Sequence, residues 1–231
     1  MKLDQVVPWG RTGNEYERMF ALDAGDLPRA ILGVADGPAS FNAEWSARGG
    51  RVVSVDPLYV FDAGQIEARF EAVLPRVMEA TLATVDAFVW DEMSSVEELE
   101  RRRRKALSTF LADYEAGRWD GRYLAAGLPH LPLASNRFDL ALCSHYLFTY
   151  SDLLDADAHL AAIVEMARVA REVRVFPLVD MFAGGPSRHL TTVLERLPAA
   201  GLTARIERVP YEFQRGANEM LVVNRLVAAA D

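Results

Sequence analysis

The sequence predicts an α/β fold built on a doubly wound, mostly parallel sheet that ends in an antiparallel hairpin. Residues 31–57 read as a strand, a small-residue turn, a helix and a second strand. A strand–helix–strand unit of this length requires parallel strands joined by a right-handed crossover. Near the other end of the chain, two β-rich runs flank "QRGAN". Because Gly and Asn tolerate positive φ, this segment predicts a hairpin.

The spacing of hydrophobic residues predicts the other strands and the helices that connect them. The runs "RAILGV" and "RVVSVDPLYV" predict the first two strands, and "FDLALCSHYLF" and "EVRVFPLVDM" predict two more. Between the last two, "DADAHLAAIVEMARVAR" keeps its apolar side chains at helical spacing, which predicts a crossover helix. The segment "SRHLTTVLERLPAAGL" is expected to form another.

The interval after the second strand is longer than a single crossover helix requires. Its first part has a helical apolar stripe, and its second part begins with a capping box, Ser95 with Glu98, and is expected to end near Gly117. We therefore expect residues 1–231 to form a single domain in which residues 62–120 are a helical insertion, serving as a lid or side wall. Arg103 interrupts the second apolar stripe, so it either snorkels or points into the cleft toward an anionic substrate.

Composition narrows the class of partner. The formal net charge is −8 and the pI is near 5.1, so a nucleic acid is not expected as a partner. The basic run "ERRRRK" is read as a solvated helix face, because neighbouring Glu residues supply i,i+3 and i,i+4 partners. No apolar run has the length of a membrane span, and the single cysteine, Cys143, cannot form an internal disulfide. A cytoplasmic protein that does not bind membranes is expected, with the oligomeric state open.

The turn after the first strand is the predicted ligand site. In doubly wound sheets, ligands lie beyond the carboxyl ends of the strands, where the strand order reverses. Asp56 falls at the end of the second strand, where a carboxylate binds ribose hydroxyls; alternatively it is a turn-forming Asp before Pro57. The turn "GVADGPAS" lacks the spacing for a pyrophosphate, and Pro38 removes one donor. An adenosyl ligand is therefore favoured over NAD.

Residues 31–57, together with "LPHLPLASNRFDLALCSHYLF" at 128–148, resemble class I S-adenosylmethionine-dependent methyltransferases. The resemblance covers residues 28–61 and 122–226 in order, with the helical segment as an insertion. It implies a Rossmann-like sheet of seven strands, S-adenosyl-L-methionine as the cofactor, and methyl transfer to an acceptor. The chain departs from the family pattern at the turn: Gly33 stands where the family carries an acid, and Ala35 and Ala39 stand at glycine positions.

Two interpretations of Asp36 follow from these departures. Either Asp36 replaces the missing acid as the acceptor for the cofactor's ammonium group, or it makes an Asx-type bond to its own turn. No acid precedes "LP" to hold the adenine, so backbone groups near Leu128 are expected to do so. The expected cofactor-binding residues are Gly33, Ala35, Asp36, Gly37, Asp56, Pro57, Leu128 and Arg11.

Three further residues are weighed for the site. His145, at the end of the fourth strand, is the expected catalytic base, or else a structural histidine bonded to a loop carbonyl. In the N-terminal segment, Arg11 is a candidate for the cofactor carboxylate and Tyr16 for closing the pocket; surface packing is the alternative for each. The four histidines are scattered without ligand spacing, so no metal is expected.

The sequence thus predicts a methyltransferase that uses S-adenosylmethionine and acts on a small-molecule acceptor. The alternative is a catalytically silent relative that binds an adenosyl ligand or a protein partner. An NAD-dependent oxidoreductase is a weaker third possibility.

Overall fold

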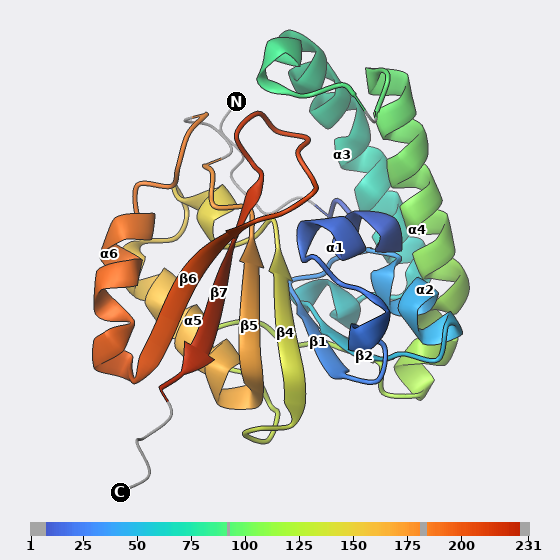
Figure 1. Cartoon of the computed structure of the whole chain (residues 1–231). Helices are drawn as coiled ribbons and strands as arrows, with labels where there is room; N and C mark the ends of the chain where they lie inside the picture. The colour runs from blue at the N-terminus through green and yellow to red at the C-terminus, as the bar shows by residue number, and fades with distance from the viewer. Residues whose placement is uncertain (1–7, 92, 181–183, 227–231) are drawn as a thin grey trace, which may run out of the picture.

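A computed structural model describes residues 8–91, 93–180 and 184–226. Its centre is a seven-stranded sheet with strand order β3-β2-β1-β4-β5-β7-β6 (Figure 1). The first five strands are parallel, and β7 lies antiparallel between β5 and β6. The predicted doubly wound sheet with a terminal hairpin is therefore confirmed. The strands are β1 (Ala30–Val34), β2 (Arg51–Val55), β3 (Tyr123–Leu124), β4 (Phe138–Ser144), β5 (Ala170–Phe176), β6 (Leu202–Arg208) and β7 (Glu219–Arg225).

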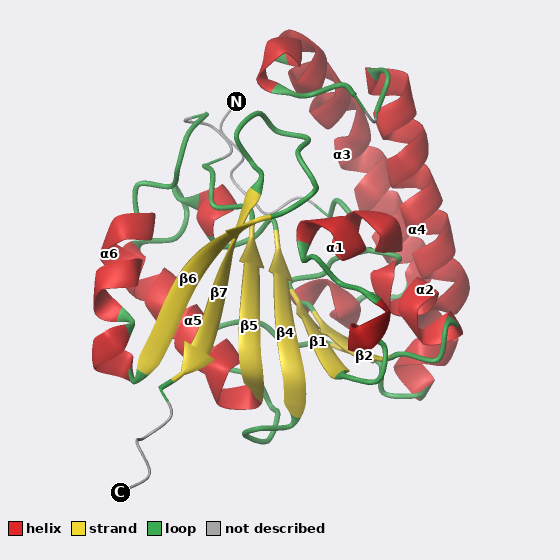
Figure 2. Ribbon diagram, viewed as in Figure 1, coloured by secondary structure: helices red, strands yellow, loops and turns green. Residues whose placement is uncertain are grey.

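Helices connect the parallel strands and cover both faces of the sheet (Figure 2). They are α1 (Gly13–Met19), α2 (Phe41–Ala47), α3 (Ala63–Ala83), α4 (Val96–Trp119), α5 (Ala156–Val169) and α6 (Leu190–Arg196). Short 3₁₀ turns add η1 (Ala24–Asp26), η2 (Pro57–Val60), η3 (Val85–Ala87), η4 (Phe148–Tyr150) and η5 (Pro198–Ala200). The sequence interpretation missed α1, although its capping box, Thr12 with Glu15, is visible in "TGNE".

Two apolar clusters divide the core by sheet face. On one face, α1 and α2 bring Phe20, Phe41 and Trp45 against β1 and β4. On the other face, α5 and α6 pack against β4 and β5 through residues such as Ile163 and Val193. Successive side chains of each strand point to opposite faces of the sheet. Because helices cover both faces, the side chains on both are buried, as is typical of a parallel sheet.

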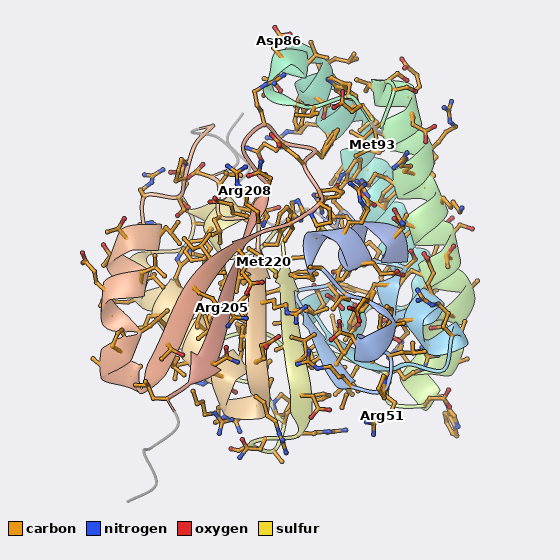
Figure 3. The ribbon with its side chains drawn as sticks, in the orientation of Figure 1. Arg51, Asp86, Met93, Arg205, Arg208 and Met220 are labelled. Atoms are coloured by element: carbon orange, nitrogen blue, oxygen red, sulfur yellow. The ribbon has the colours of Figure 1, made fainter. Side chains whose placement is uncertain are left out.

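The helices α3 and α4 fill the interval between β2 and β3 and share a third apolar cluster. Asp86 marks the outer tip of this insertion, at the end of the molecule opposite Arg51, the first residue of β2 (Figure 3). On α4, the side chains of Arg101 and Arg104 are exposed and pair with Glu98, Glu71 and Glu100. The basic run on α4 therefore includes exposed arginines paired with glutamates, as the sequence predicted. Among helices of the described residues, none is long and apolar enough to cross a membrane.

The strand order reverses between β1 and β4, which creates the predicted switch point. Val34 at the end of β1 pairs with Val55 of β2 on one side and with Cys143 of β4 on the other. The residues that follow, Ala35 and Asp56 among them, therefore leave the sheet at one common edge. Ligands of doubly wound sheets bind at this edge.

Candidate cofactor and active site

The turn after β1 brings the carboxylate of Asp36 back over Gly33. A Cβ atom built on Gly33 would lie 1.8 Å from Oδ2 of Asp36 and 2.7 Å from Oδ1. The carboxylate thus fills the space in which a side chain at position 33 would begin. Any larger residue at position 33 would displace it. The resemblance to the family implies an acidic side chain at position 33. In this chain the carboxylate of Asp36, in the turn, lies at that place instead.

Two hydroxyl groups hold the Asp36 carboxylate in this position. Tyr16 donates to Oδ1 at 2.8 Å and Ser54 donates to Oδ2 at 2.6 Å. Asp36 is buried, and burial raises its pKa to about 7 in spite of these two hydrogen bonds. The side chain makes no hydrogen bond to its own turn among the described residues. The Asx-turn interpretation is therefore wrong, and so is surface packing for Tyr16, which is 1% exposed.

Asp56 ties the end of β2 to the same turn. One carboxylate oxygen accepts from the main-chain nitrogen of Leu58 at 2.7 Å and caps η2, while the other accepts from the nitrogen of Gly37 at 2.8 Å. Tyr59 donates its hydroxyl to the main-chain oxygen of Gly37 at 2.7 Å. Burial raises the pKa of Asp56. The turn-forming interpretation is confirmed by the cap, while the ribose contact stays a prediction.

Backbone conformation explains the glycine pattern of this turn. Ala35 has φ of 55° and Gly37 has φ of 52°, both in the left-handed region that favours glycine. Ala35 is held there by a hydrogen bond from its nitrogen to the main-chain oxygen of Val55, at 2.9 Å. Alanine at position 35 therefore adopts a conformation that glycine would adopt with less strain.

The loop predicted to lie beside the adenine adjoins the end of β2. A Cβ atom on Gly127 would lie 3.0 Å from Cγ of Pro57, so the two loops are in close contact. Leu128 follows, partly buried against the core cluster on the α5 side of the sheet. Pro57 therefore lies beside the loop that leads into Leu128, and the adenine contact of Leu128 stays a prediction.

The segment before α1 lies across the turn. A Cβ atom on Gly10 would lie 2.0 Å from the main-chain oxygen of Pro38. Arg11, the next residue, donates from Nη1 to the main-chain oxygen of Trp9 at 3.3 Å, and its Nε atom is buried without a hydrogen-bond partner. Burial lowers the pKa of Arg11, and the nearby Arg103 guanidinium adds to this. Arg11 is therefore a cation at the turn without an ion-pair partner among the described residues.

Arg103 does not behave as predicted. It is 1% exposed and its guanidinium binds the carboxylate of Glu15 through hydrogen bonds of 2.7 and 2.5 Å. A snorkelling side chain and a cation free to meet a substrate are both excluded by this buried pair. Although burial alone would raise it, the Arg103 guanidinium lowers the pKa of Glu15 to about 2. Sequence reasoning could not find this contact because the partners lie 88 residues apart.

His145 follows β4 at the same edge of the sheet. Its φ is 50°, its main-chain nitrogen donates to the oxygen of Phe176 at 2.6 Å, and its Nδ1 atom lies 2.9 Å from Oγ of Ser144. Burial lowers the pKa of His145 well below its usual value, with Arg11 and Arg103 adding to the effect. The imidazole is therefore neutral at pH 7. Its ring makes no hydrogen bond to a loop carbonyl in the part of the chain that the structure describes.

The structure thus gathers the predicted residues at one edge, and it adds others that the sequence reasoning missed. Ser54, Tyr59, Gly10 and Glu15 hold the turn or the segment before α1. The one polar residue in the apolar core of "RVVSV" was a usable signal for Ser54. Two surface hollows lie at the opposite end of the sheet, around Arg29 and Arg51, where Arg29 is already paired with Asp26. Within the described residues, no three His, Cys, Asp or Glu side chains gather as metal ligands.

Comparison with solved structures identifies the class of fold. The mitomycin 7-O-methyltransferase MmcR superposes with a TM-score of 0.50 at 14% identity, over 92% of this chain and 53% of that chain. The Burkholderia thailandensis 1,6-didemethyltoxoflavin-N1-methyltransferase, solved with S-adenosylhomocysteine, gives a TM-score of 0.45 at 17% identity, over 86% of this chain and 71% of its own. The strand order of the sheet and the superposition on MmcR give the chain the fold of class I S-adenosylmethionine-dependent methyltransferases.

A sequence relative gives the particular family. The uncharacterized protein MJ0045 of Methanocaldococcus jannaschii is 33% identical over 227 residues, which span 97% of this chain and 99% of the relative. The chain belongs to the same family as this archaeal protein. No protein-family model matches the sequence.

Proposed function

We propose that this protein is a methyltransferase that transfers a methyl group from S-adenosylmethionine to a small-molecule acceptor. The observation that carries the proposal is the position of the Asp36 carboxylate over Gly33. An acid at the end of the first strand is the feature that the turn lacked by sequence, and the fold supplies it from three residues further on. The fold itself is that of methyltransferases.

The charges of the turn suit an adenosyl ligand with an amino-acid tail. The ammonium and sulfonium groups of S-adenosylmethionine are cations, and Asp36 and Asp56 are the acids nearest the turn. In this proposal Asp36 accepts from the ammonium group and Asp56 accepts from the ribose hydroxyls. Arg11 binds the carboxylate of the ligand, which gives its unpaired guanidinium an anion.

The remaining predicted contacts are apolar or main-chain. In this proposal Gly33 leaves room for the Asp36 carboxylate, Ala35 and Gly37 leave room for the ligand at the turn, and Pro57 and Leu128 form the side of the adenine site. Each residue lies at the carboxyl edge of β1, β2 or β3, or in the loop after it.

The bound cofactor would supply an electrophilic methyl group, and the chain would supply position and proton transfer. Methyl transfer from a sulfonium requires in-line alignment of the acceptor, with a base only where the acceptor must lose a proton. In this proposal His145, neutral at pH 7, accepts that proton. The lowered pKa makes it a weak base, which suits an acceptor whose own proton is acidic.

The second candidate is a catalytically silent protein that binds an adenosyl ligand. The observation favouring it is that the turn satisfies itself: Gly37 donates to Asp56, while Tyr16 and Ser54 donate to Asp36. Turnover separates the two candidates, because both bind the ligand.

Calorimetric titration with S-adenosylmethionine, S-adenosylhomocysteine and NADH tests the proposal. We expect micromolar binding of the first two and none of NADH. If none of the three binds, the turn is a closed site and both candidates fail. His145→Gln is expected to leave S-adenosylhomocysteine affinity unchanged and to abolish methylation of an acceptor found by substrate screening.

A further inference from the structure

The helical insertion touches the segment before α1 at a buried charge cluster. We refer to residues 8–12 as the N-terminal segment. Trp9 of this segment stacks on Phe70 of α3, with ring centroids 5.5 Å apart. One turn of α4 places Arg103 against the same segment. Both long helices of the insertion therefore contact the chain that carries Arg11.

The Arg103–Glu15 pair fixes the backbone on both sides of Arg11. On one side, Arg103 donates from Nη1 to the main-chain oxygen of Gly10 at 3.2 Å. On the other side, the Glu15 carboxylate accepts from the nitrogen of Thr12 at 2.9 Å and from its hydroxyl at 3.0 Å. The main chain of Arg11 has little freedom between these two anchors.

The opposite side of the N-terminal segment lies against the turn. The main-chain oxygen of Arg11 accepts from the nitrogen of Ser40 at 3.0 Å. A Cβ atom on Gly10 would lie only 2.0 Å from the main-chain oxygen of Pro38. The N-terminal segment is therefore held between the turn and α4. Its position depends on a contact with Arg103 of the insertion, which lies 93 residues from Gly10 in the sequence.

The cluster contains two guanidinium groups, Arg11 and Arg103, and one carboxylate, Glu15, so its net charge is positive. Glu15 is neutralised by its two hydrogen bonds with Arg103, and Tyr211 also donates to it at 3.0 Å. Arg11 makes no ion pair with a carboxylate among the described residues; the Arg103 guanidinium repels it, while the charge of Glu15, already paired with Arg103, attracts it. A partly buried cation with a buried, unbonded Nε atom is stabilised by an anionic ligand.

We propose that Arg103 and Glu15 are positioning residues that hold Arg11 against the carboxylate of the bound adenosyl ligand. The helical insertion then has a defined role, which is to provide the wall against which the N-terminal segment is fixed. This inference rests on the proposed function, because it takes Arg11 as the carboxylate contact.

The test compares two ligands that differ only in that carboxylate. S-adenosylhomocysteine and its decarboxylated analogue are titrated by calorimetry into the full-length protein and its variants. The wild type is expected to prefer S-adenosylhomocysteine by roughly tenfold or more, the range of one charge-assisted hydrogen bond. The variants Arg103→Met and Arg103→Lys are expected to lose most of this preference while binding the decarboxylated analogue as the wild type does.

Removing one partner of a buried pair can prevent folding, because the other charge stays buried. The double variant Glu15→Gln/Arg103→Met removes both charges and is measured beside the single variants, with circular dichroism to establish folding. Arg122→Met is the matched control. Arg122, which lies between α4 and β3, makes a bidentate pair with Asp113 of α4 at 2.7 and 2.6 Å, and no contact of its side chain with residues 8–12 is present in the described part of the chain. Its ligand preference is expected to match the wild type.

The outcomes separate this inference from the proposed function. If the wild type binds neither ligand, the proposed function fails and the inference fails with it. If the wild type shows the preference and the folded Arg103 or double variants keep it, the positioning role alone is wrong. A loss of preference in these variants, but not in Arg122→Met, supports it.

Discussion

The Asp36 carboxylate occupies the space above Gly33, with Oδ2 only 1.8 Å from where a Cβ atom on Gly33 would stand. Gly33 and Asp36 therefore depend on each other, because only a residue without a side chain at position 33 leaves space for the Asp36 carboxylate. An acid therefore lies beside the end of the first strand, although it comes from a residue three positions further along the chain.

Substitution at Gly33 tests the interdependence directly. Gly33→Ala is expected to push the Asp36 side chain away from Tyr16 and Ser54, leaving buried hydroxyls without an acceptor. We expect a loss of about 1–3 kcal/mol in the free energy of unfolding, measured by urea denaturation, and weaker S-adenosylhomocysteine binding. The swap Gly33→Asp/Asp36→Ser returns the acid to the strand and is expected to recover binding. Failure of the swap to bind better than Gly33→Ala would contradict the equivalence of the two positions.

The pKa of Asp36 predicts how stability depends on pH. Burial raises this pKa from its ordinary value near 3.8 to about 7. The folded state therefore binds a proton that the unfolded state has released between about pH 4 and 7. The contribution of Asp36 to stability is fully present below about pH 4 and is lost as the pH rises toward 7. The difference in unfolding free energy between wild type and Asp36→Asn should change by a few kcal/mol across this window, and a constant difference would refute the shift.

Ligand affinity should depend on the same group in the opposite direction. An ammonium group requires Asp36 to be ionised, so the affinity for S-adenosylhomocysteine is expected to rise as the pH increases from about 6 to 8. Titrations in this range measure the effect. Asp36→Asn is expected to bind more weakly and without this pH dependence. If the variant shows the same pH profile as the wild type, another group is responsible.

Ala35 offers a test of backbone strain. Its φ of 55° costs a non-glycine residue roughly 1 kcal/mol. Ala35→Gly removes this strain, partly offset by the greater freedom of glycine in the unfolded chain, and is expected to raise the melting temperature or leave it unchanged. Ala39→Gly is the control, because Ala39 is buried and its φ is not left-handed. We expect that change to lower stability by about 0.5–1 kcal/mol.

Asp56 is predicted to contact the ribose as well as to cap η2. Asp56→Ala should weaken S-adenosylhomocysteine binding by about 1.5–3 kcal/mol, the range for a lost hydrogen bond to a charged group. The matched control is Asp62→Ala, which removes the cap of α3 from the nitrogen of Gln65 without touching the turn. Equal effects of the two substitutions would assign Asp56 a structural role only.

Much of the fold could be predicted because its signals are local. The strands β1, β2, β4, β5, β6 and β7 are short apolar runs bounded by turn residues. Pairs of strands joined by crossover helices must be parallel, and the turn at "QRGAN" closes a hairpin. β3, with two residues, has no pattern to recognise. The helix α1 has seven residues, too few for a clear apolar period, so its capping box is its main local signal.

The candidate site was predictable in place but not in detail. Asp56 and His145 follow predicted strands, so their positions at the carboxyl edge follow from the parallel sheet. The direction of the Asp36 side chain does not, because it depends on Tyr16, Ser54 and the free space above Gly33. These residues come from three different parts of the chain.

The sequence by itself determined the sheet, its order of elements and the edge at which a ligand would bind, since periodicity, turn residues and chain connectivity are local properties. Only the tertiary structure decided which charges meet. Arg103 pairs with Glu15 across 88 residues, and the neighbouring Arg11 makes no ion pair within the described part of the chain. The physical reason is that a buried charge takes whichever opposite charge the fold brings within hydrogen-bond distance, and spacing along the chain does not specify that partner.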